Sequence, residues 1–114
     1  LHDVVIVKAV RTPIGSFRSS LAGLTAPQLG AIAIKGALNG MSAVDEVVMG
    51  HVLSAGCGQA PAKQAAQGAG LPDETVCWTV NKVCSSGMKA IQAGALSIAL
   101  GQTRSCVAGG MESM

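Results

Sequence analysis

Apolar residues follow two alternating patterns along this chain. Short runs rich in Val and Ile indicate strands, and longer stretches with apolar residues at helical spacing indicate helices. The predicted elements are strands over 3–7, 44–53, 75–81 and 105–108, separated by helices over 25–38, 61–69 and 85–100. This alternation predicts an α/β fold with a mostly parallel sheet joined by right-handed crossovers.

The ends of the predicted helices carry residues that start or stop a helix. Thr25 is placed to cap the first helix, and Asn39-Gly40 follows its last residue. Pro61 starts the second helix and Gly70 stops it. Because residues 3–7 form a nearly continuous β-branched run, they predict the first central strand, covered on both faces.

The predicted helix over 85–100 has almost no polar face. Lys89 and Gln92, near its start, are the exceptions in a stretch of Ala, Gly, Leu, Ile and Met. A helix that is apolar all round is buried, and one small sheet cannot cover it on every side. We therefore expect this helix to lie between layers, with a second sheet, outside this sequence, supplying the remaining cover.

Composition adds a requirement for a partner surface. Hydrophobic residues make up 49% of the 114 residues, charged residues 12%, and the mean hydropathy is +0.47, so polar groups are too few to cover an isolated domain. The net charge of +2 comes from scattered residues, which argues against a nucleic-acid partner, and no apolar stretch is continuous enough to span a bilayer. The chain opens directly on the first predicted strand with no basic amphipathic segment before it, although a removed targeting peptide would leave the same picture.

Cys84 is the strongest candidate for chemistry. It lies where the third predicted strand ends and the apolar helix begins, in Val80-Asn81-Lys82-Val83-Cys84-Ser85-Ser86-Gly87. The unpaired N–H groups and the dipole of a helix N-terminus favour a thiolate nucleophile there, as does the nearby Lys82, and Gly87 leaves the approach open. The backbone N–H of Cys84 is also a candidate oxyanion donor. The alternative is a buried structural cysteine, since free Cys is among the most buried residue types.

The other thiols have weaker claims on a function. Cys77 and Cys106 fall within predicted interior strands, where Cys acts as a small hydrophobic residue, and Cys57 lies in a loop. The four cysteines form no CxxC pair and lie far in sequence from both histidines, so the sequence predicts no metal site and no thioredoxin-like pair. Without a secretory signal or a cysteine framework, we expect reduced thiols in an intracellular compartment.

His51 and Glu112 each allow two interpretations. His51 is either a base for Cys84 or a hydrogen-bonded residue of a strand. Glu112 is either a general acid or base or a carboxylate that fixes a loop through hydrogen bonds. The Gly109-Gly110 pair before it resembles a phosphate-binding turn. Because it lacks the GxGxxG and P-loop patterns, it is only a weak signal for phosphate binding.

Five motifs occur in order along the chain. They are Arg11 to Phe17, Gly58-Gln59-Ala60-Pro61 with Gln64-Ala65, Gly68 to Pro72, Val80 to Ala90 around Cys84, and Val107 to Met114. Together they resemble the thiolase family, in particular its acetyl-CoA acetyltransferases. The likeness spans essentially the whole chain, and five motifs in register are a specific signal.

The resemblance implies a fold of two similar βαβαβαββ halves stacked as α-β-α-β-α, with the helix of the nucleophile in the middle layer. Residues 1–114 then form an incomplete N-terminal thiolase domain, with the loop and C-terminal domains absent. In the implied mechanism, Cys84 takes the acetyl group of one acetyl-CoA and passes it to a second, giving acetoacetyl-CoA and CoA, and the reverse reaction is thiolysis. The alternatives are a degradative 3-ketoacyl-CoA thiolase and a non-catalytic thiolase-fold module in which Cys84 is inert.

The resemblance also implies the substrates, partners, assembly and location of the enzyme. Coenzyme A thioesters are its substrates, no cofactor or metal is expected, and neither nucleic acid nor a membrane is a partner. The expected assembly is a homodimer or homotetramer that acts in lipid metabolism in the cytoplasm or the mitochondrion.

The chain departs from the family pattern in three respects. The activating histidine, the second cysteine and most CoA-binding loops of the family lie beyond the position of Met114, so this chain alone is not expected to turn over. Between Leu38 and Val44 it is a few residues shorter than is usual, through either a deletion or missing residues. His51 stands where the family often has Asn, which favours a variable strand residue over a catalytic one.

Overall fold

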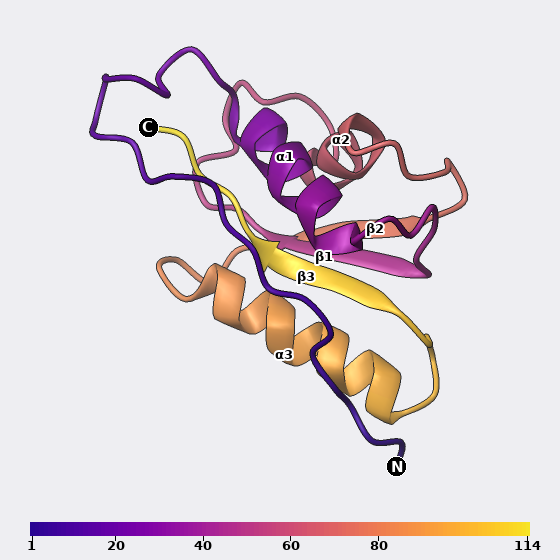
Figure 1. The fold of residues 1–114 in the computed structure, drawn as a ribbon. Helices are drawn as coiled ribbons and strands as arrows, with labels where there is room; N and C mark the ends of the chain where they lie inside the picture. Colours follow the sequence, from indigo (N-terminus) through magenta and orange to yellow (C-terminus); the bar gives the residue numbers. More distant parts are fainter.

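Three parallel strands form the single sheet of the computed structural model, which describes residues 1–114 (Figure 1). The strands are β1 (Glu46–Gly50), β2 (Val76–Val80) and β3 (Cys106–Gly110), in the order β2-β1-β3. Gly50 is paired with Val80 on one side and with Gly110 on the other, so all three strands end at the same edge. The predicted parallel α/β arrangement is confirmed for this part of the sheet.

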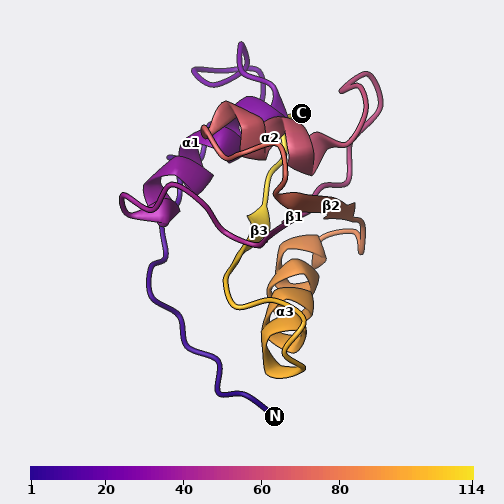
Figure 2. The same cartoon turned by 90° about the vertical axis from the view of Figure 1, so that its right-hand side faces the viewer.

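Helices cover both faces of the sheet. Helices α1 (Ala26–Leu38) and α2 (Pro61–Gly68) pack on one face, and α3 (Ser86–Ala99) packs on the other (Figures 1 and 2). The connection that follows α1 closes with a hydrogen bond from the N–H of Met41 to the carbonyl of Leu38 at 2.9 Å. None of the helices has the length and the apolar character that crossing a membrane requires.

Local capping fixes the start and the end of α1. The Thr25 hydroxyl accepts a hydrogen bond from the N–H of Gln28 at 3.3 Å, and the Gln28 side chain accepts one from the N–H of Thr25 at 2.9 Å. This reciprocal pair is a capping box, which satisfies two otherwise unpaired donors. Asn39 ends the helix in a left-handed conformation, at φ 51°, as short polar residues can. The bounds predicted for this helix are confirmed.

The main core lies between the sheet and the α1–α2 layer. Small side chains allow α1, α2 and β3 to approach closely, because a Cβ on Gly30 of α1 would lie 2.6 Å from the sulfur of Met111. The buried residues of this cluster are Ala26, Ile34, Leu38, Val44, Val47, Met49, Ala62, Ala65, Ala66, Ala69, Leu71 and Met111. The layer is therefore built mainly from Ala and aliphatic residues, as the composition indicated.

A buried carboxylate joins α3 to the first residue of β1. Glu46 accepts hydrogen bonds from the indole nitrogen of Trp78 at 2.6 Å and from the hydroxyl of Ser97 at 2.8 Å. Buried carboxylates are costly unless hydrogen-bonded, and both oxygens of Glu46 have a partner. This network fixes the C-terminal half of α3 against the sheet, while the N-terminal half is held by other contacts.

The structure does not contain the strand predicted over 3–7. This segment runs past β3 and α3 without pairing (Figure 1), and Val5, Ile6 and Val7 are exposed. The only backbone hydrogen bond near it joins the N–H of His2 to the carbonyl of Ala99 at 2.9 Å. A β-branched run favours extended backbone, but a strand also needs a neighbouring strand to pair with, and this segment has none.

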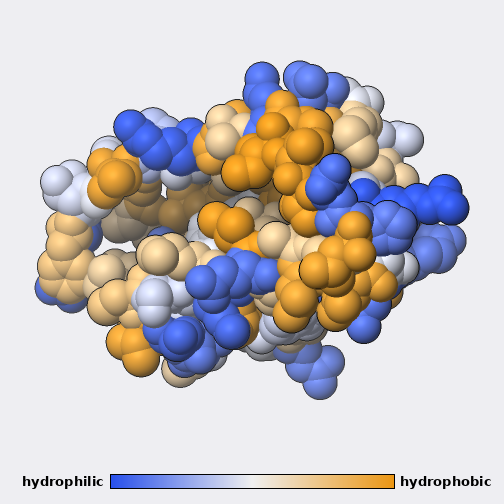
Figure 3. Space-filling model, turned by 90° about the horizontal axis from the view of Figure 1, so that it is seen from below, coloured by the Kyte–Doolittle hydropathy of each residue, from blue (hydrophilic) through white to orange (hydrophobic).

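Within these 114 residues, helix α3 is buried on one face only, which agrees with the expectation that its remaining cover comes from outside this sequence. Ser86, Ala90, Gly94 and Ser97 face the sheet and are buried. The opposite face exposes Met88, Ile91, Leu96 and Leu100. Seen from the α3 side, apolar side chains gather at the surface (Figure 3). One sheet covers one face of the helix, so the cover expected for the other face is not part of these 114 residues.

Replacing Thr25 with Ala tests the capping box. Gln28 loses the acceptor for its N–H, so we expect a loss of roughly 1 kcal/mol in the free energy of unfolding. Urea denaturation followed by circular dichroism measures it. Ser20→Ala is the matched control, because Ser20 is exposed and its hydroxyl makes no hydrogen bond. Equal stability of the two variants would contradict the assignment.

Candidate active site

An open hollow of about 560 Å³ lies at the edge where the three strands end. In parallel α/β sheets, ligands bind beyond the carboxyl ends of the strands. Its walls come from the segments that follow β1 and β3 and from the start of α3. The lining residues are Gly50, Val52, Leu53, Val83, Cys84, Ser86, Gly87, Gly110, Met111, Glu112 and Met114.

Cys84 lies in this hollow, in the turn between β2 and α3, and is exposed. The backbone N–H groups of Cys84, Gly87 and Met88 donate no hydrogen bond. These are the unpaired donors that the first turn of a helix leaves, and they can stabilise negative charge on a sulfur or on a carbonyl oxygen. The structure thus places an accessible thiol beside free amide donors, which is an arrangement suited to acyl transfer.

The turn that carries Cys84 is strained and is held by a buried serine. Val83 has φ 49°, a left-handed conformation that is unusual for a β-branched residue. Its N–H donates to the side-chain oxygen of Asn81 at 3.0 Å. The Ser86 hydroxyl, only 4% exposed, donates to the carbonyl of Val83 at 2.6 Å and accepts from the N–H of Lys82 at 2.7 Å. Strain of this kind costs about 1–3 kcal/mol and persists where surrounding bonds over-determine it.

Glycines let the start of α3 sit directly on the ends of two strands. A Cβ on Gly50 would lie 2.4 Å from the carbonyl carbon of Ser86, and a Cβ on Gly110 would lie 3.2 Å from the Cα of Gly87. From the sequence, Gly87 is expected to keep the approach to Cys84 open, and Gly50 has no predicted role. The structure shows that Gly50 and Gly110 allow backbone to pack on backbone at the start of α3, which fixes the height of Cys84 above the sheet. Gly87 lines the hollow beside Cys84.

Glu112 connects the segments that leave β1 and β3. Its Oε1 accepts from the N–H of Leu53 at 2.8 Å, and its Oε2 accepts from the N–H of Val52 at 3.1 Å. Through these bonds Glu112 fixes a loop, which is one of the two roles that the sequence allows for this residue. The carboxylate also lines the hollow, so it holds one wall of the site that contains Cys84.

His51 does not lie in the hollow. Its side chain is fully buried, and its Nε2 lies 3.5 Å from Oε1 of Glu112. Neither ring nitrogen makes a hydrogen bond. The interpretation of His51 as the base for Cys84 therefore has no support in this geometry, and the expected hydrogen bond of a strand histidine is also missing.

The other thiols differ from Cys84 in their surroundings. Burial raises the pKa of the Cys106 thiol to about 12, and the nearby Glu46 carboxylate acts in the same direction. Burial also raises the pKa of the Cys77 thiol, although the positive charge of Lys63 opposes the shift. Cys57 is half-buried, with its sulfur 3.8 Å from the carbonyl of Leu53. Cys77 and Cys106 thus behave as the small hydrophobic residues that the sequence predicted.

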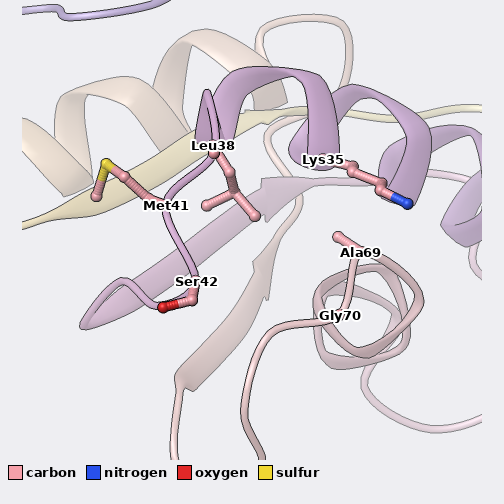
Figure 4. A pocket seen from close by; sticks show the side chains of 7 residues that line it. Lys35, Leu38, Met41, Ser42, Ala69 and Gly70 are labelled. Atoms are coloured by element: carbon pink, nitrogen blue, oxygen red, sulfur yellow. The ribbon is translucent and has the colours of Figure 1, made fainter.

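A second hollow, of about 320 Å³, lies between the end of α1 and the end of α2 (Figure 4). It is lined by Lys35, Leu38, Gly40, Met41, Ser42, Ala69 and Gly70. It contains no thiol and no carboxylate, and its only polar side chains are those of Lys35 and Ser42. Cys84 and its surroundings are the better candidate for an active site.

Known proteins are similar to this chain over nearly its whole length. The family described as "Thiolase, N-terminal domain" matches residues 4–114. An acetyl-CoA acetyltransferase of Schizosaccharomyces pombe is 60% identical over 98% of this chain and 29% of its own length. A mitochondrial acetyl-CoA acetyltransferase of Danio rerio is 57% identical over 100% of this chain and 28% of its own length. This chain therefore spans less than a third of the length of these relatives.

A solved structure extends the comparison to the fold. The crystal structure of the Acat5 thiolase from Ascaris suum in complex with coenzyme A matches with a TM-score of 0.80 and 47% sequence identity. The match covers 83% of this chain and 26% of that chain. The fold class that the resemblance implied is thereby confirmed for this part of the architecture.

Replacing Gly50 with Ala tests the backbone contact beneath Cys84. The added Cβ must displace the first turn of α3, so we expect the free energy of unfolding to fall by about 1–3 kcal/mol. Urea denaturation measures the loss. Gly23→Ala is the control, because a Cβ there meets nothing within 4 Å. If both variants are as stable as the parent, α3 does not rest on Gly50.

Alkylation tests whether the thiols differ in reactivity as their surroundings predict. A raised pKa keeps a thiol protonated as pH rises, so the thiolate of Cys106 stays scarce until pH approaches about 12. At about pH 8, iodoacetamide should label Cys84 well before Cys77 and Cys106, because it reacts with exposed thiolate. Peptide mapping of timed samples measures the order. Labelling of Cys106 as fast as Cys84 in the folded protein would contradict this arrangement.

Proposed function

The chain belongs to the thiolase family, matching its N-terminal domain over residues 4–114, and we propose that it carries the acyl-accepting cysteine of an acetyl-CoA acetyltransferase. The observation that carries the proposal is the exposed thiol of Cys84 in a hollow, beside backbone donors that have no partner. The activity named for the relatives in Schizosaccharomyces pombe and Danio rerio supports the choice of acetyl-CoA as substrate.

The first half-reaction transfers the acetyl group to the chain. The sulfur of Cys84 adds to the thioester carbonyl of acetyl-CoA, and the negative charge that develops on the carbonyl oxygen is stabilised by the N–H of Cys84. The carbon–sulfur bond to CoA then breaks. CoA leaves with the proton that the Cys84 thiol gave up, and an S-acetyl group remains on Cys84.

The second half-reaction forms a carbon–carbon bond. A second acetyl-CoA, deprotonated at its α-carbon, attacks the acetyl carbon on Cys84, and acetoacetyl-CoA leaves as the thiolate of Cys84 is restored. The proton from the α-carbon needs a base. Glu112 is the only carboxylate that lines the hollow, and both of its oxygens accept backbone hydrogen bonds. We therefore assign the base to a part of the enzyme outside residues 1–114.

The same proposal covers the substrates, the assembly and the location of the enzyme. It works on coenzyme A thioesters with no cofactor or metal, as a homodimer or homotetramer, in the cytoplasm or the mitochondrion. The mitochondrial location named for the Danio rerio relative supports one of the two compartments.

Acetyl transfer to Cys84 is the direct test. The protein, expressed with any continuation of its reading frame, is incubated with acetyl-CoA, quenched in acid and peptide-mapped by mass spectrometry. We expect one acetyl thioester, on Cys84, that hydroxylamine removes.

Two variants serve as controls for this experiment. Cys84→Ser should abolish the acetyl thioester, and Cys57→Ser should leave it unchanged, because Cys57 is a second partly accessible thiol outside the lining of the hollow. An intact fold by circular dichroism with no acetyl group on Cys84 would leave the chain as a non-catalytic module.

A further inference from the structure

The wall of the Cys84 hollow depends on a single carboxylate. Glu112, which follows β3, accepts hydrogen bonds from the backbone N–H groups of Val52 and Leu53, which follow β1. Val52, Leu53 and Glu112 all line the hollow. No other side chain bonds these two amides, so their position relative to Cys84 is set by where the Glu112 carboxylate lies.

Beneath Glu112 lies a buried histidine whose polar atoms have no partner. His51 is 2% exposed, and neither of its ring nitrogens makes a hydrogen bond. A neutral imidazole always carries an N–H on one nitrogen and a lone pair on the other. Leaving such groups buried and unpaired is costly, so an unpaired histidine in a core calls for an explanation.

The carboxylate of Glu112 lies next to that ring. The Nε2 of His51 lies 3.5 Å from Oε1 of Glu112, just beyond hydrogen-bond distance. A side chain on Gly50 would point toward α3, so that of His51, the next residue, points toward the layer of α1 and α2. The ring therefore lies on the α1–α2 side of the sheet, next to the carboxylate and outside the lining of the hollow.

No other charged group competes for His51 from the elements around it. The only charged residue of α1 is Lys35, which lines the other hollow, and the only one of α2 is Lys63. The ammonium of Lys63 donates to the carbonyls of Asp73 and Thr75, at the opposite end of β2. Strands β2 and β3 contain no charged residue, and their titratable groups are the thiols of Cys77 and Cys106.

We propose that His51 is a positioning residue for the Cys84 site, acting through Glu112. If the carboxylate swings toward solvent, the ring loses this neighbouring acceptor, and the amides of Val52 and Leu53 lose the acceptor of their hydrogen bonds at the same moment. His51 therefore raises the free energy of every conformation in which the Glu112 carboxylate leaves the wall of the hollow. The effect on acetyl transfer rests on the proposed function, whereas the effect on the wall does not.

Three substitutions separate positioning from a structural role. His51→Leu removes both unpaired nitrogens, so if His51 only fills space, this variant is at least as stable as the parent and transfers acetyl groups equally fast. His51→Gln places an amide nitrogen close to where Nε2 lies, and so restores a donor to Glu112. Glu112→Gln keeps the shape of the side chain but removes its charge and replaces one of the two acceptor oxygens with an NH2 donor.

The proposal predicts changes in amide exchange and in acetyl transfer. In the complete protein, His51→Leu and Glu112→Gln should each speed deuterium exchange at the amides of Val52 and Leu53 by about tenfold. The maximal rate of Cys84 acetylation should fall by about tenfold in both, with little change in the acetyl-CoA concentration that gives half the maximal rate. His51→Gln should recover most of both effects, and the double variant should lose no more than either single one.

Either of two results would overturn the proposal. One is unchanged exchange at Val52 and Leu53 in His51→Leu, and the other is a failure of His51→Gln to restore what His51→Leu loses. If the parent protein acquires no acetyl group on Cys84, the proposed function fails, but the exchange measurements still decide whether His51 holds Glu112 in place.

Discussion

The geometry of the site depends on the contact between the bare backbone of Gly50 and the first turn of α3. Because no Cβ can stand between Gly50 and Ser86, the helix begins directly above the end of β1. Gly87 and Gly110 make the same kind of approach at the end of β3. Cys84, just before this turn, therefore stands at a height set by main-chain atoms, which are less free to move than side chains are.

The strain at Val83 has a stabilising counterpart close by. The left-handed backbone at this residue turns the chain sharply from β2 into α3, and the hydroxyl of Ser86 bonds to the main chain on both sides of it. The energy released by those bonds offsets the cost of the turn. Three backbone donors are left free around Cys84 because the turn ends before helical bonding begins. The same local geometry thus holds the thiol and supplies the groups that stabilise charge near it.

The sequence predicted those features that local residues determine. The capping box at Thr25 and the left-handed Asn39 fixed the bounds of α1, and the strand-to-helix junction placed Cys84 at the start of α3. It failed where the outcome depends on distant partners. Residues 3–7 have strand-forming side chains but no strand beside them. The roles of Gly50 and of the His51–Glu112 contact depend on residues that meet only in the folded chain, so local sequence does not reveal them.

The register of β1 limits how the length of the chain can change. This strand is paired on both sides, and a single residue inserted within it would turn every following side chain to the opposite face. His51 would then point to the α3 side, and a residue with a side chain would take the place of Gly50, where there is no room even for a Cβ. Residues 39–43 connect α1 to β1 and lie outside the paired strands. A connection shorter than is usual in the family therefore leaves the pairing of the sheet unchanged. The pairing on both sides of β1 therefore allows changes of length in the connections and opposes them within the three strands.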